Sequence, residues 1–350
     1  MPEMALCCPF WSHGAPALGV SGRCARCSCL PMGLALHLHS KQFACKYCYE
    51  IQKGGALLKL ERILCPVDFS EFSAKAYDYA HSLARHYGAK LFVLHVTEPI
   101  ISIYRGYMSA AMVDEIYTRQ TADTQEKVRK LSERHQGGQV ESDVVVQLGI
   151  VSDSILTLAE TQEIDLIVMG THGRRGIDRL AMGSNTERVL RKALCPVLAV
   201  REPVRDFVSS ASAVEPVQLR KIVCCTDFSD NSPRALEYAF SLAAQYEAEV
   251  TLLHVLEDSG AGPRLEEQKE QAFKRLEEVI PSEAQNWATV IPLVRAGKPY
   301  EEIMEHAAQT QADLIVMGVR GRNALDVALF GSTTHRVIQL GPCPVLVVRT

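Results

Sequence analysis

The sequence predicts an α/β protein of two tandem, doubly wound, five-stranded parallel sheets, preceded by a cysteine-rich N-terminal extension. Two observations carry this prediction. The chain repeats itself, because RILCPVDFS at 62–70 returns as KIVCCTDFS at 221–229. Each copy also alternates short, continuously apolar runs with helical patterns, which is typical of parallel strands covered on both faces. Right-handed crossovers between such strands give a doubly wound sheet.

The elements of the first copy follow from its residue patterns. Its strands are short apolar runs, expected at 62–67, 91–96, 140–148, 165–169 and 196–200. Its helices have apolar residues three and four apart, and are expected before Gly88, at 110–135, at 152–162 and from Ser184. Ser70 or Ser73 is suited to cap the first of these helices, and Gly88 is suited to end it.

The second copy repeats this order. Its strands are expected before Asp227 and at 250–255, 288–295, 313–317 and 344–348. Its helices are expected from Ser232 and Pro233, at 264–280, at 299–310 and from Ser332. A proline fits the first turn of a helix because its missing N–H would have no partner there.

The repeat divides the chain into parts. We expect an extension at 1–58, domains at 59–202 and 218–350, and a linker at 203–217 that is rich in Pro, Ser and Ala without a period. Each short fifth strand would leave an exposed sheet edge. We therefore expect the two fifth strands to pair, so that the chain forms an intramolecular pseudo-dimer.

Composition and charge exclude several classes of protein. The 350 residues carry a net charge of −4, whereas a general nucleic-acid binder is usually basic. No apolar run approaches the roughly 20 residues that span a membrane. The N-terminus lacks the pattern of a signal peptide. We therefore expect a cytoplasmic protein that binds neither nucleic acid nor membrane.

The extension at 1–58 holds two C-x-x-C pairs, Cys24 with Cys27 and Cys45 with Cys48. Their spacing falls within the range of zinc ribbons, so four thiolates can close a tetrahedral zinc site. A disordered tail and an over-extended start of the chain are the alternatives. The five later cysteines lie in or beside expected strands and are read as buried thiols.

A motif G-x-x-G-x9-G-S follows the fourth strand of each copy. Its residues are Gly170, Gly173, Gly183 and Ser184, and then Gly318, Gly321, Gly331 and Ser332. A strand, a glycine loop and a helix start present backbone N–H groups to a phosphate. We expect the first glycine to permit a sharp exit from the strand. Each serine either donates to a phosphate or caps the helix. The loop arginines either neutralise charge or are solvated: Arg174, Arg175, Arg320 and Arg322.

An aspartate, Asp68 or Asp227, ends the first strand of each copy. Ligands of open parallel sheets bind at the carboxyl ends of the strands, where the winding reverses. If the first and fourth strands are neighbours, the aspartate and the glycine loop face one crevice. A carboxylate suits a ribose hydroxyl or an adenine amino group, and the loop suits phosphates. His95 and His254 lie close by and are read as packed residues.

At this point the chain resembles the universal stress protein family over about 60–201 and 218–349. The resemblance rests on V-D-F-S or T-D-F-S, on L-H-V after the second strand, and on the complete glycine motif in both halves. It implies a Rossmann-like sheet ordered 3-2-1-4-5 and the ATP-binding branch of the family. Family members commonly form dimers through the fifth strand, so a homodimer is a further expectation.

The resemblance also implies which residues bind ATP, with or without Mg²⁺. They are Pro66, Asp68, Val96, Met169, Gly170, Gly173, Gly183 and Ser184, and then Asp227, Val255, Met317, Gly318, Gly321, Gly331 and Ser332. Core packing is the alternative for the two methionines. Cys225 stands where the first copy has Pro66, which usually touches the base.

Three functions remain open on the sequence alone. The leading one is an ATP-binding module of stress response or signalling that acts on an unknown protein partner. The second is a slow ATPase or another nucleotide-cleaving enzyme. The third is an interaction module with empty sites. No Ser–His–Asp set or carboxylate pair recurs in both halves, so we expect no efficient enzyme and assign no catalytic residue.

Overall fold

A computed structural model describes residues 58–97, 109–133, 140–172, 182–201, 206–208, 217–229, 232–257, 263–281, 284, 288–319 and 331–349. The chain divides into two compact units, Met1–Tyr49 and Glu50–Thr350. Every described residue belongs to the second unit. The four cysteines proposed for zinc therefore lie outside the described residues.

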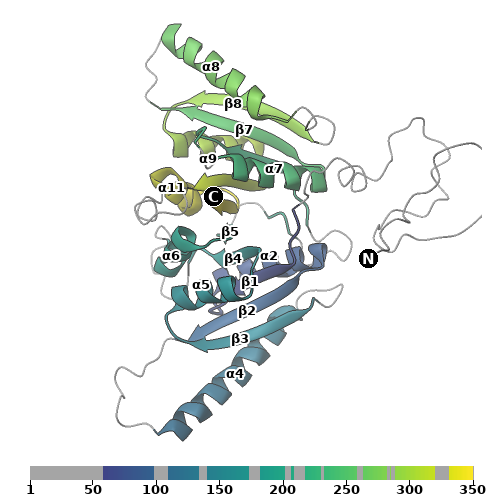
Figure 1. Ribbon diagram of the computed structural model, residues 1–350, viewed down its shortest axis with the longest axis vertical. Coiled ribbons are helices and arrows are strands. Elements are labelled where there is room, and N and C mark those ends of the chain that lie inside the picture. The colour runs from purple at the N-terminus through teal and green to yellow at the C-terminus, as the bar shows by residue number, and fades with distance from the viewer. Residues whose placement is uncertain are drawn as a thin grey trace, which may run out of the picture. The chain divides into compact units, whose positions relative to one another are not determined.

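The second unit contains two series of alternating strands and helices (Figure 1). The first series is β1 Arg62–Pro66, α2 Glu71–Tyr87, β2 Lys90–Thr97, α4 Ala110–Ser132, β3 Ser142–Leu148, α5 Val151–Thr161, β4 Leu166–Gly170, α6 Ser184–Lys192 and β5 Val197–Val200. The second series is β6 Lys221–Cys225, α7 Ser232–Tyr246, β7 Glu249–Leu256, α8 Pro263–Val279, β8 Thr289–Ala296, α9 Pro299–Thr310, β9 Leu314–Val319, α11 Ser332–Leu340 and β10 Val345–Arg349. Both series match the alternation expected from the sequence.

The strands form one ten-stranded sheet in the order β3-β2-β1-β4-β5-β10-β9-β6-β7-β8. Within each half all neighbouring strands are parallel, and the five strands, numbered along the chain, lie across the sheet in the order 3-2-1-4-5. The halves meet where β5 pairs with β10 in antiparallel fashion, with Leu198 opposite Leu346. The fifth strands thus pair within the chain, as their exposed edges led us to expect.

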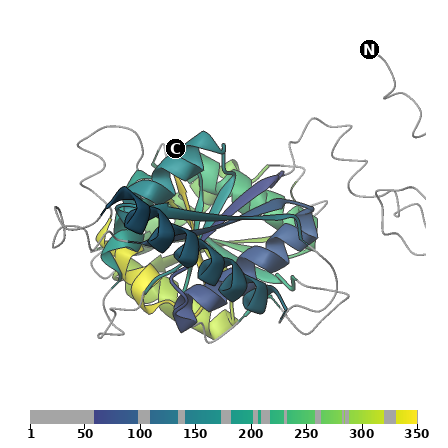
Figure 2. The same cartoon turned by 90° about the horizontal axis from the view of Figure 1, so that it is seen from below.

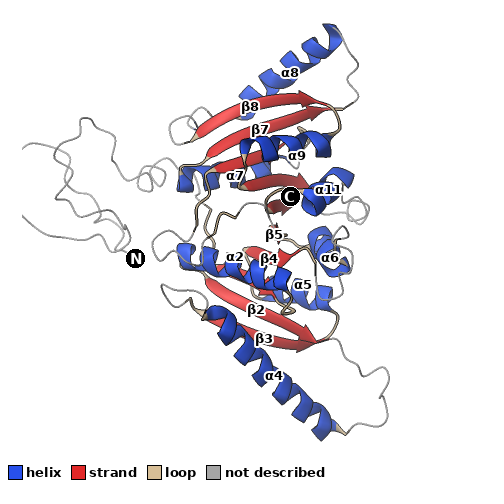
Figure 3. Ribbon diagram, turned by 180° about the vertical axis from the view of Figure 1, so that it is seen from behind, coloured by secondary structure: helices blue, strands red, loops and turns tan. Residues whose placement is uncertain are grey.

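Helices cover both faces of this sheet (Figures 2 and 3). One apolar cluster joins the sheet to α2, α4, α7 and α8, and a second joins the opposite face to α5, α6, α9 and α11. Because each cluster contains residues of both halves, the two halves present equivalent faces to the same side. Apolar side chains on both sides of the strands explain why the strand sequences are continuously apolar.

Helix α2 shows how the sequence pattern becomes structure. Ser70 is its cap, and the Ser70 Oγ accepts a hydrogen bond from the Ser73 backbone N–H at 3.3 Å. Ala76 and Ala80 are fully buried against the sheet. Gly88 ends the helix at φ 65°, a left-handed conformation that glycine adopts at little cost. Of the two serines considered from the sequence, Ser70 is therefore the cap.

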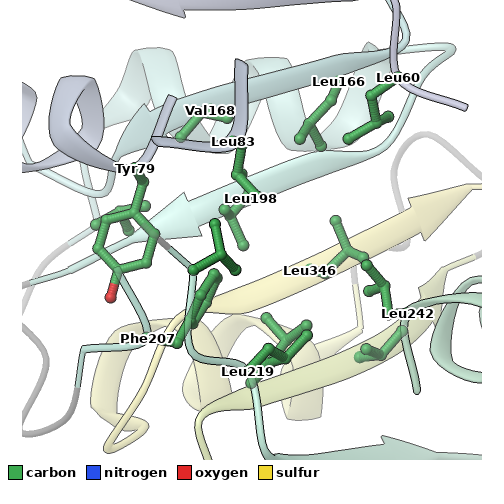
Figure 4. Close-up of a cluster of buried hydrophobic side chains, with 14 of the residues drawn as sticks. Leu60, Tyr79, Leu83, Leu166, Val168, Leu198, Phe207, Leu219, Leu242 and Leu346 are labelled. Carbon is green, nitrogen blue, oxygen red and sulfur yellow. The ribbon is translucent and has the colours of Figure 1, made fainter. Parts of the chain in front are cut away.

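An apolar cavity lies at the junction of the halves, on the α2 and α7 side of the sheet (Figure 4). Its empty volume is about 430 Å³ when the part that is open to solvent is included. Equivalent residues of the two halves line it in pairs: Leu83 with Leu242, Leu198 with Leu346, Leu60 with Leu219, Tyr87 with Tyr246, and Leu166 with Leu314. The junction is therefore built on an internal pseudo-twofold relation.

The described part of the linker is packed against this junction. Phe207 is 3 % exposed, and its ring meets the edge of Tyr79 at a centroid distance of 4.9 Å. The Asp206 carboxylate accepts hydrogen bonds from Tyr79 Oη at 2.6 Å and from Lys75 Nζ at 2.5 Å. These contacts hold the linker onto α2, so in this region it is not a loose tether.

A buried carboxylate at the amino edge of the sheet gives a test of the fold. Asp313 Oδ2 accepts hydrogen bonds from the backbone N–H groups of Arg220 and Lys221, both at 2.9 Å. Asp165 makes the same pair of bonds in the first half. Since hydrogen bonds to charged groups contribute about 1.5–3 kcal/mol each, Asp313→Ala should lower the free energy of unfolding by about 3 kcal/mol in urea titrations.

The matched control is Asp313→Asn, whose amide oxygen still accepts hydrogen bonds. We expect it to lose about half as much stability as the alanine variant. Equal losses for the two variants would contradict the role assigned to the acceptor oxygen.

Candidate nucleotide site

The sheet places the predicted site residues of each half at one edge. In the first half β1 pairs with β4, with Leu64 opposite Ile167, so Asp68 lies level with the residue after Gly170. In the second half β6 pairs with β9, with Cys224 opposite Val316. The first and fourth strands are neighbours in both halves. Each aspartate therefore lies beside the entry to its glycine loop, as the crevice hypothesis requires.

Each site aspartate is held by the turn that follows it. Asp68 Oδ1 accepts hydrogen bonds from the backbone N–H and the hydroxyl of Ser70, at 3.0 and 2.6 Å. Asp227 Oδ1 accepts from the Ser229 backbone N–H at 2.9 Å and from the Ser232 hydroxyl at 3.0 Å. These bonds use one oxygen of each carboxylate and fix the direction of the group.

The charge state of Asp227 follows from these contacts. Burial raises the pKa of Asp227, but the hydrogen bonds from Ser229 and Ser232 outweigh it and hold that pKa below its usual range. The carboxylate is therefore ionised throughout the neutral pH range and can only accept hydrogen bonds there. An acceptor of this kind suits hydroxyl and amino groups of a ligand.

Gly170 is required by close packing. A Cβ at this position would lie 3.0 Å from the backbone carbon and oxygen of Phe72, in the first turn of α2. Gly170 is part of β4 and pairs with Val200 of β5, and its φ is not positive. The need for glycine here therefore does not come from a left-handed backbone conformation. Glycine is needed because α2 passes too close for a side chain.

The third glycine of each motif caps the next helix. Gly183 caps α6 and Gly331 caps α11, and neither cap is made by a side chain. The serines at 184 and 332 are the first residues of these helices, so the cap considered for them is wrong. Among the described residues other than its chain neighbours, a Cβ on Gly183 would come no closer than 3.4 Å to a heavy atom, and one on Gly331 no closer than 3.9 Å.

Gly183 and Gly331 differ from Gly170, because a Cβ has space at 183 and 331 and has none at 170. The packing of the described residues explains glycine at 170, and it does not explain glycine at 183 or 331. Ser184 and Ser332, the first residues of α6 and α11, are both exposed beside these glycines. The cradle at each helix start is therefore one that a side chain would fill, which fits a bound phosphate.

The apolar residues predicted to contact the base share one face of the sheet. Met169 and Met317 are buried in the cluster on the α5 and α9 side, and Val96 and Val255 pack against it. Cys225 packs against the same cluster in the second half. The structure thus gathers these residues on one face, and the methionines are core residues, 5 and 6 % exposed.

Several predicted residues lie outside the described part of the chain. They are Gly173 and Gly321 together with the loop arginines Arg174, Arg175, Arg320 and Arg322. Among the residues that the structure does describe, no three His, Cys, Asp or Glu side chains form a candidate metal site. Searching the same residues for a membrane-spanning helix finds none that is both long and apolar enough.

Sequence reasoning missed the threonines that tie the glycine loop to the sheet. Thr186 donates from Oγ1 to the carbonyl oxygen of Gly170 at 3.0 Å, which holds the start of α6 at the end of β4. Thr334 is the matching residue of α11 and is 5 % exposed. The available signal was a threonine two positions after the motif serine in both copies.

The first loop also has an anchor that the second lacks. Thr171 Oγ1 and His172 Nδ1 lie 2.9 Å apart, and the imidazole packs on the Phe72 ring at 5.0 Å. Thr171 and His172 are 1 and 5 % exposed. Val319 stands in place of Thr171 in the second half. The two sites therefore differ at the loop entry, a difference that was visible in the sequence but was not used.

Comparison with known proteins agrees with this architecture. The profile of the universal stress protein family matches residues 59–201 and 218–349. A universal stress protein of Mycolicibacterium smegmatis is 28 % identical over 300 residues, 82 % of this chain and 96 % of that protein. One of Methanocaldococcus jannaschii is 30 % identical over 159 residues, 45 % of this chain and 89 % of that protein.

A solved structure has the same tandem arrangement of elements. It is a universal stress protein from Archaeoglobus fulgidus, with a TM-score of 0.62, 24 % identity, and coverage of 82 % of this chain and 96 % of that chain. At this identity the likeness speaks for the fold alone. With both halves matched by the family profile, the chain belongs to the universal stress protein family.

Proposed function

We propose that this chain binds ATP at two sites, one in each half, and acts as a nucleotide-dependent module of stress response or signalling in the cytoplasm. The observation that supports this most is the duplicated edge of the sheet. In each half an oriented carboxylate, Asp68 or Asp227, lies beside a glycine-capped helix start with room that the described residues do not fill.

Different residues of each site would bind different parts of the nucleotide. Asp68 and Asp227 would bind the nucleoside by accepting hydrogen bonds, and Val96, Val255 and the strand-four methionines would lie beside the base. The glycine loops, with the serines at 184 and 332, would hold the phosphates through backbone N–H groups and hydroxyls. Bound nucleotide would then alter the surface offered to a protein partner or to a second copy of the chain.

The test is a titration with ATP, ADP, AMP and cAMP, the last being the ligand of one solved universal stress protein. Calorimetry should saturate near two ATP per chain, and native mass spectrometry should detect retained adenine nucleotide. Asp68→Ala and Asp227→Ala should each reduce the stoichiometry to about one, because each removes one nucleoside acceptor. The variant with both changes should bind at least ~100-fold more weakly, which corresponds to ~2.7 kcal/mol.

The control is Asp114→Ala, the same substitution at an exposed position of α4. It should leave both sites intact. No binding of any of these nucleotides at millimolar concentration would refute the proposal and favour an interaction module. Hydrolysis on the order of 1 per second, as in ordinary kinases, with loss in Asp68→Ala, would replace it with an enzyme.

A further inference from the structure

A strained residue follows the site aspartate in both halves. Phe69 has a φ of 63° and Phe228 a φ of 58°. A positive φ is rare for a bulky side chain, because Cβ approaches the backbone in the left-handed region. Such strain persists only where the surrounding structure enforces it, and it gathers at functional sites. The same outlier at the same position in two diverged copies calls for a reason.

The histidine at the end of the second strand contacts the residue before the site aspartate and the residue after it. His95 Nδ1 lies 2.7 Å from the carbonyl oxygen of Val67, the residue before Asp68. The same imidazole packs on the ring of Phe69, the residue after Asp68, at 5.0 Å. A carbonyl oxygen only accepts, so Nδ1 carries the hydrogen.

The second half repeats these contacts with other residues at the turn. His254 Nδ1 donates to the carbonyl oxygen of Thr226 at 2.9 Å, and the His254 ring packs on Phe228 at 4.4 Å. Burial, aided by the charge of Arg275, lowers the pKa of His254, so this ring is neutral near pH 7. A neutral ring packs on Phe228 without placing a second cation under it.

A cation from the next helix along the chain lies over each phenylalanine ring. The histidine, the phenylalanine and this cation are called the stack below. Lys127 of α4 lies over the Phe69 ring, 5.2 Å from its centroid to Nζ. Arg275 of α8 lies over the Phe228 ring, 4.1 Å from its centroid to Cζ. Cations above a ring face are attracted by its electron density. Each phenylalanine ring therefore contacts both a histidine and a cation, which come from different elements.

The phenylalanine rings and the residues predicted to contact the base lie on opposite faces of the sheet. Phe69 and Phe228 pack against the cluster on the α2 and α7 side of the sheet, while Val96 and Val255 pack against the cluster on the opposite side. The phenylalanine of each Asp-Phe-Ser turn thus lies on the opposite face of the sheet from the valine predicted to contact the base. Movement of the phenylalanine ring would turn the backbone that carries the carboxylate.

We propose that Phe69 and Phe228 are positioning residues, each held by its contacts with a histidine and a helix cation so that the preceding aspartate points at the nucleoside. This inference rests on the proposed function. It adds that α4 and α8 influence nucleotide affinity, α4 through Lys127 and α8 through Arg275. By linkage, bound nucleotide should in turn hold these cations on their rings.

The test compares Phe228→Ala with Phe228→Gly by calorimetry and thermal unfolding. Both remove the ring, but glycine accepts the positive φ and alanine does not, so the glycine variant should unfold at the higher temperature. If the ring positions Asp227, both variants should bind ATP at the second site about tenfold more weakly. Phe228→Tyr keeps the stack and should keep wild-type affinity.

The cation has its own test with a matched control on the same helix. Arg275→Gln should weaken ATP binding at the second site about threefold, in line with a cation over an aromatic ring. Arg264→Gln, at an exposed position of α8, should have no effect. The first site is an internal reference in every variant, since its own stack is unchanged.

The outcomes separate this inference from the proposed function. If wild-type protein binds no nucleotide, the proposed function fails. If wild-type protein binds two ATP and both Phe228 variants keep their affinity, the positioning role is refuted and the nucleotide sites stand. If Phe228→Gly binds ATP more tightly than Phe228→Ala, in the same order as their unfolding temperatures, the positioning role is also refuted. Phe228 would then have a structural role only.

Discussion

Nucleotide binding should be lost in the double variant Gly183→Val, Gly331→Val, while the fold survives. The branched side chains would fill the cradles at the starts of α6 and α11, where a Cβ now meets nothing closer than 3.4 Å. Both residues are helix caps without a side-chain contribution, so the change should lower stability by only about 1 kcal/mol. Calorimetry should show ATP affinity reduced by ~100-fold or more, that is by ~2.7 kcal/mol.

The comparison variant is Gly170→Ala, in the same motif. Its Cβ would meet the Phe72 backbone at 3.0 Å, so the folded state must shift, and a melting experiment should show the larger loss of stability here. The two glycine positions thus have opposite expected phenotypes. Valine variants at 183 and 331 that melt normally and still bind two ATP would show that phosphates do not use these cradles.

The order and type of the elements could be predicted because the sequence states them twice. A weak pattern in one half, such as the polar helix at 110–135, is supported by its partner in the other half. The boundaries were less accurate. The fourth strand was expected to end at 169, but it includes Gly170 because this residue pairs with Val200 across the sheet. Pairing of this kind depends on a distant strand and leaves no local signal.

The candidate site was partly predictable for the same reason. Asp68 and Asp227 could be placed because parallel strands bring their carboxyl ends to one edge. The stack behind each aspartate could not be predicted, although D-F-S and L-H-V stand in both copies. Neither the positive φ of Phe69 nor the reach of Lys127 from α4 follows from residue spacing. Both arise from packing between elements that are far apart in the chain.

At the junction of the halves, the sequence predicted the pairing of the fifth strands but not the packing of the linker. Composition marked 203–217 as a linker and carried no sign of contacts with either half. Phe207 is instead buried, and Asp206 is bonded to Tyr79 and Lys75 of α2. Because Ser70, the cap of α2, also holds Asp68, the linker and the first nucleotide site share one helix.

Replacing Leu198 by aspartate should uncouple the two halves. Leu198 lies directly opposite Leu346 where β5 meets β10, and the two side chains are 3 and 5 % exposed (Figure 4). The change removes an apolar side chain from the junction and puts a carboxylate beside a wholly apolar cavity. A loss of about 4 kcal/mol is expected from the missing packing and the buried charge. Since 1 kcal/mol shifts the midpoint of domains this large by about 2–4 °C, scanning calorimetry should record a midpoint about 10 °C lower.

The matched control is Leu194→Asp, the same substitution three residues before β5 at a side chain that is 66 % exposed. It should leave the melting midpoint unchanged, because no buried apolar contact is lost. In Leu198→Asp the second half should also begin to unfold separately from the first, since β10 loses the partner that joins it to β5. A single, unshifted transition in Leu198→Asp would mean that the three residue pairs between β5 and β10 contribute little to holding the halves together.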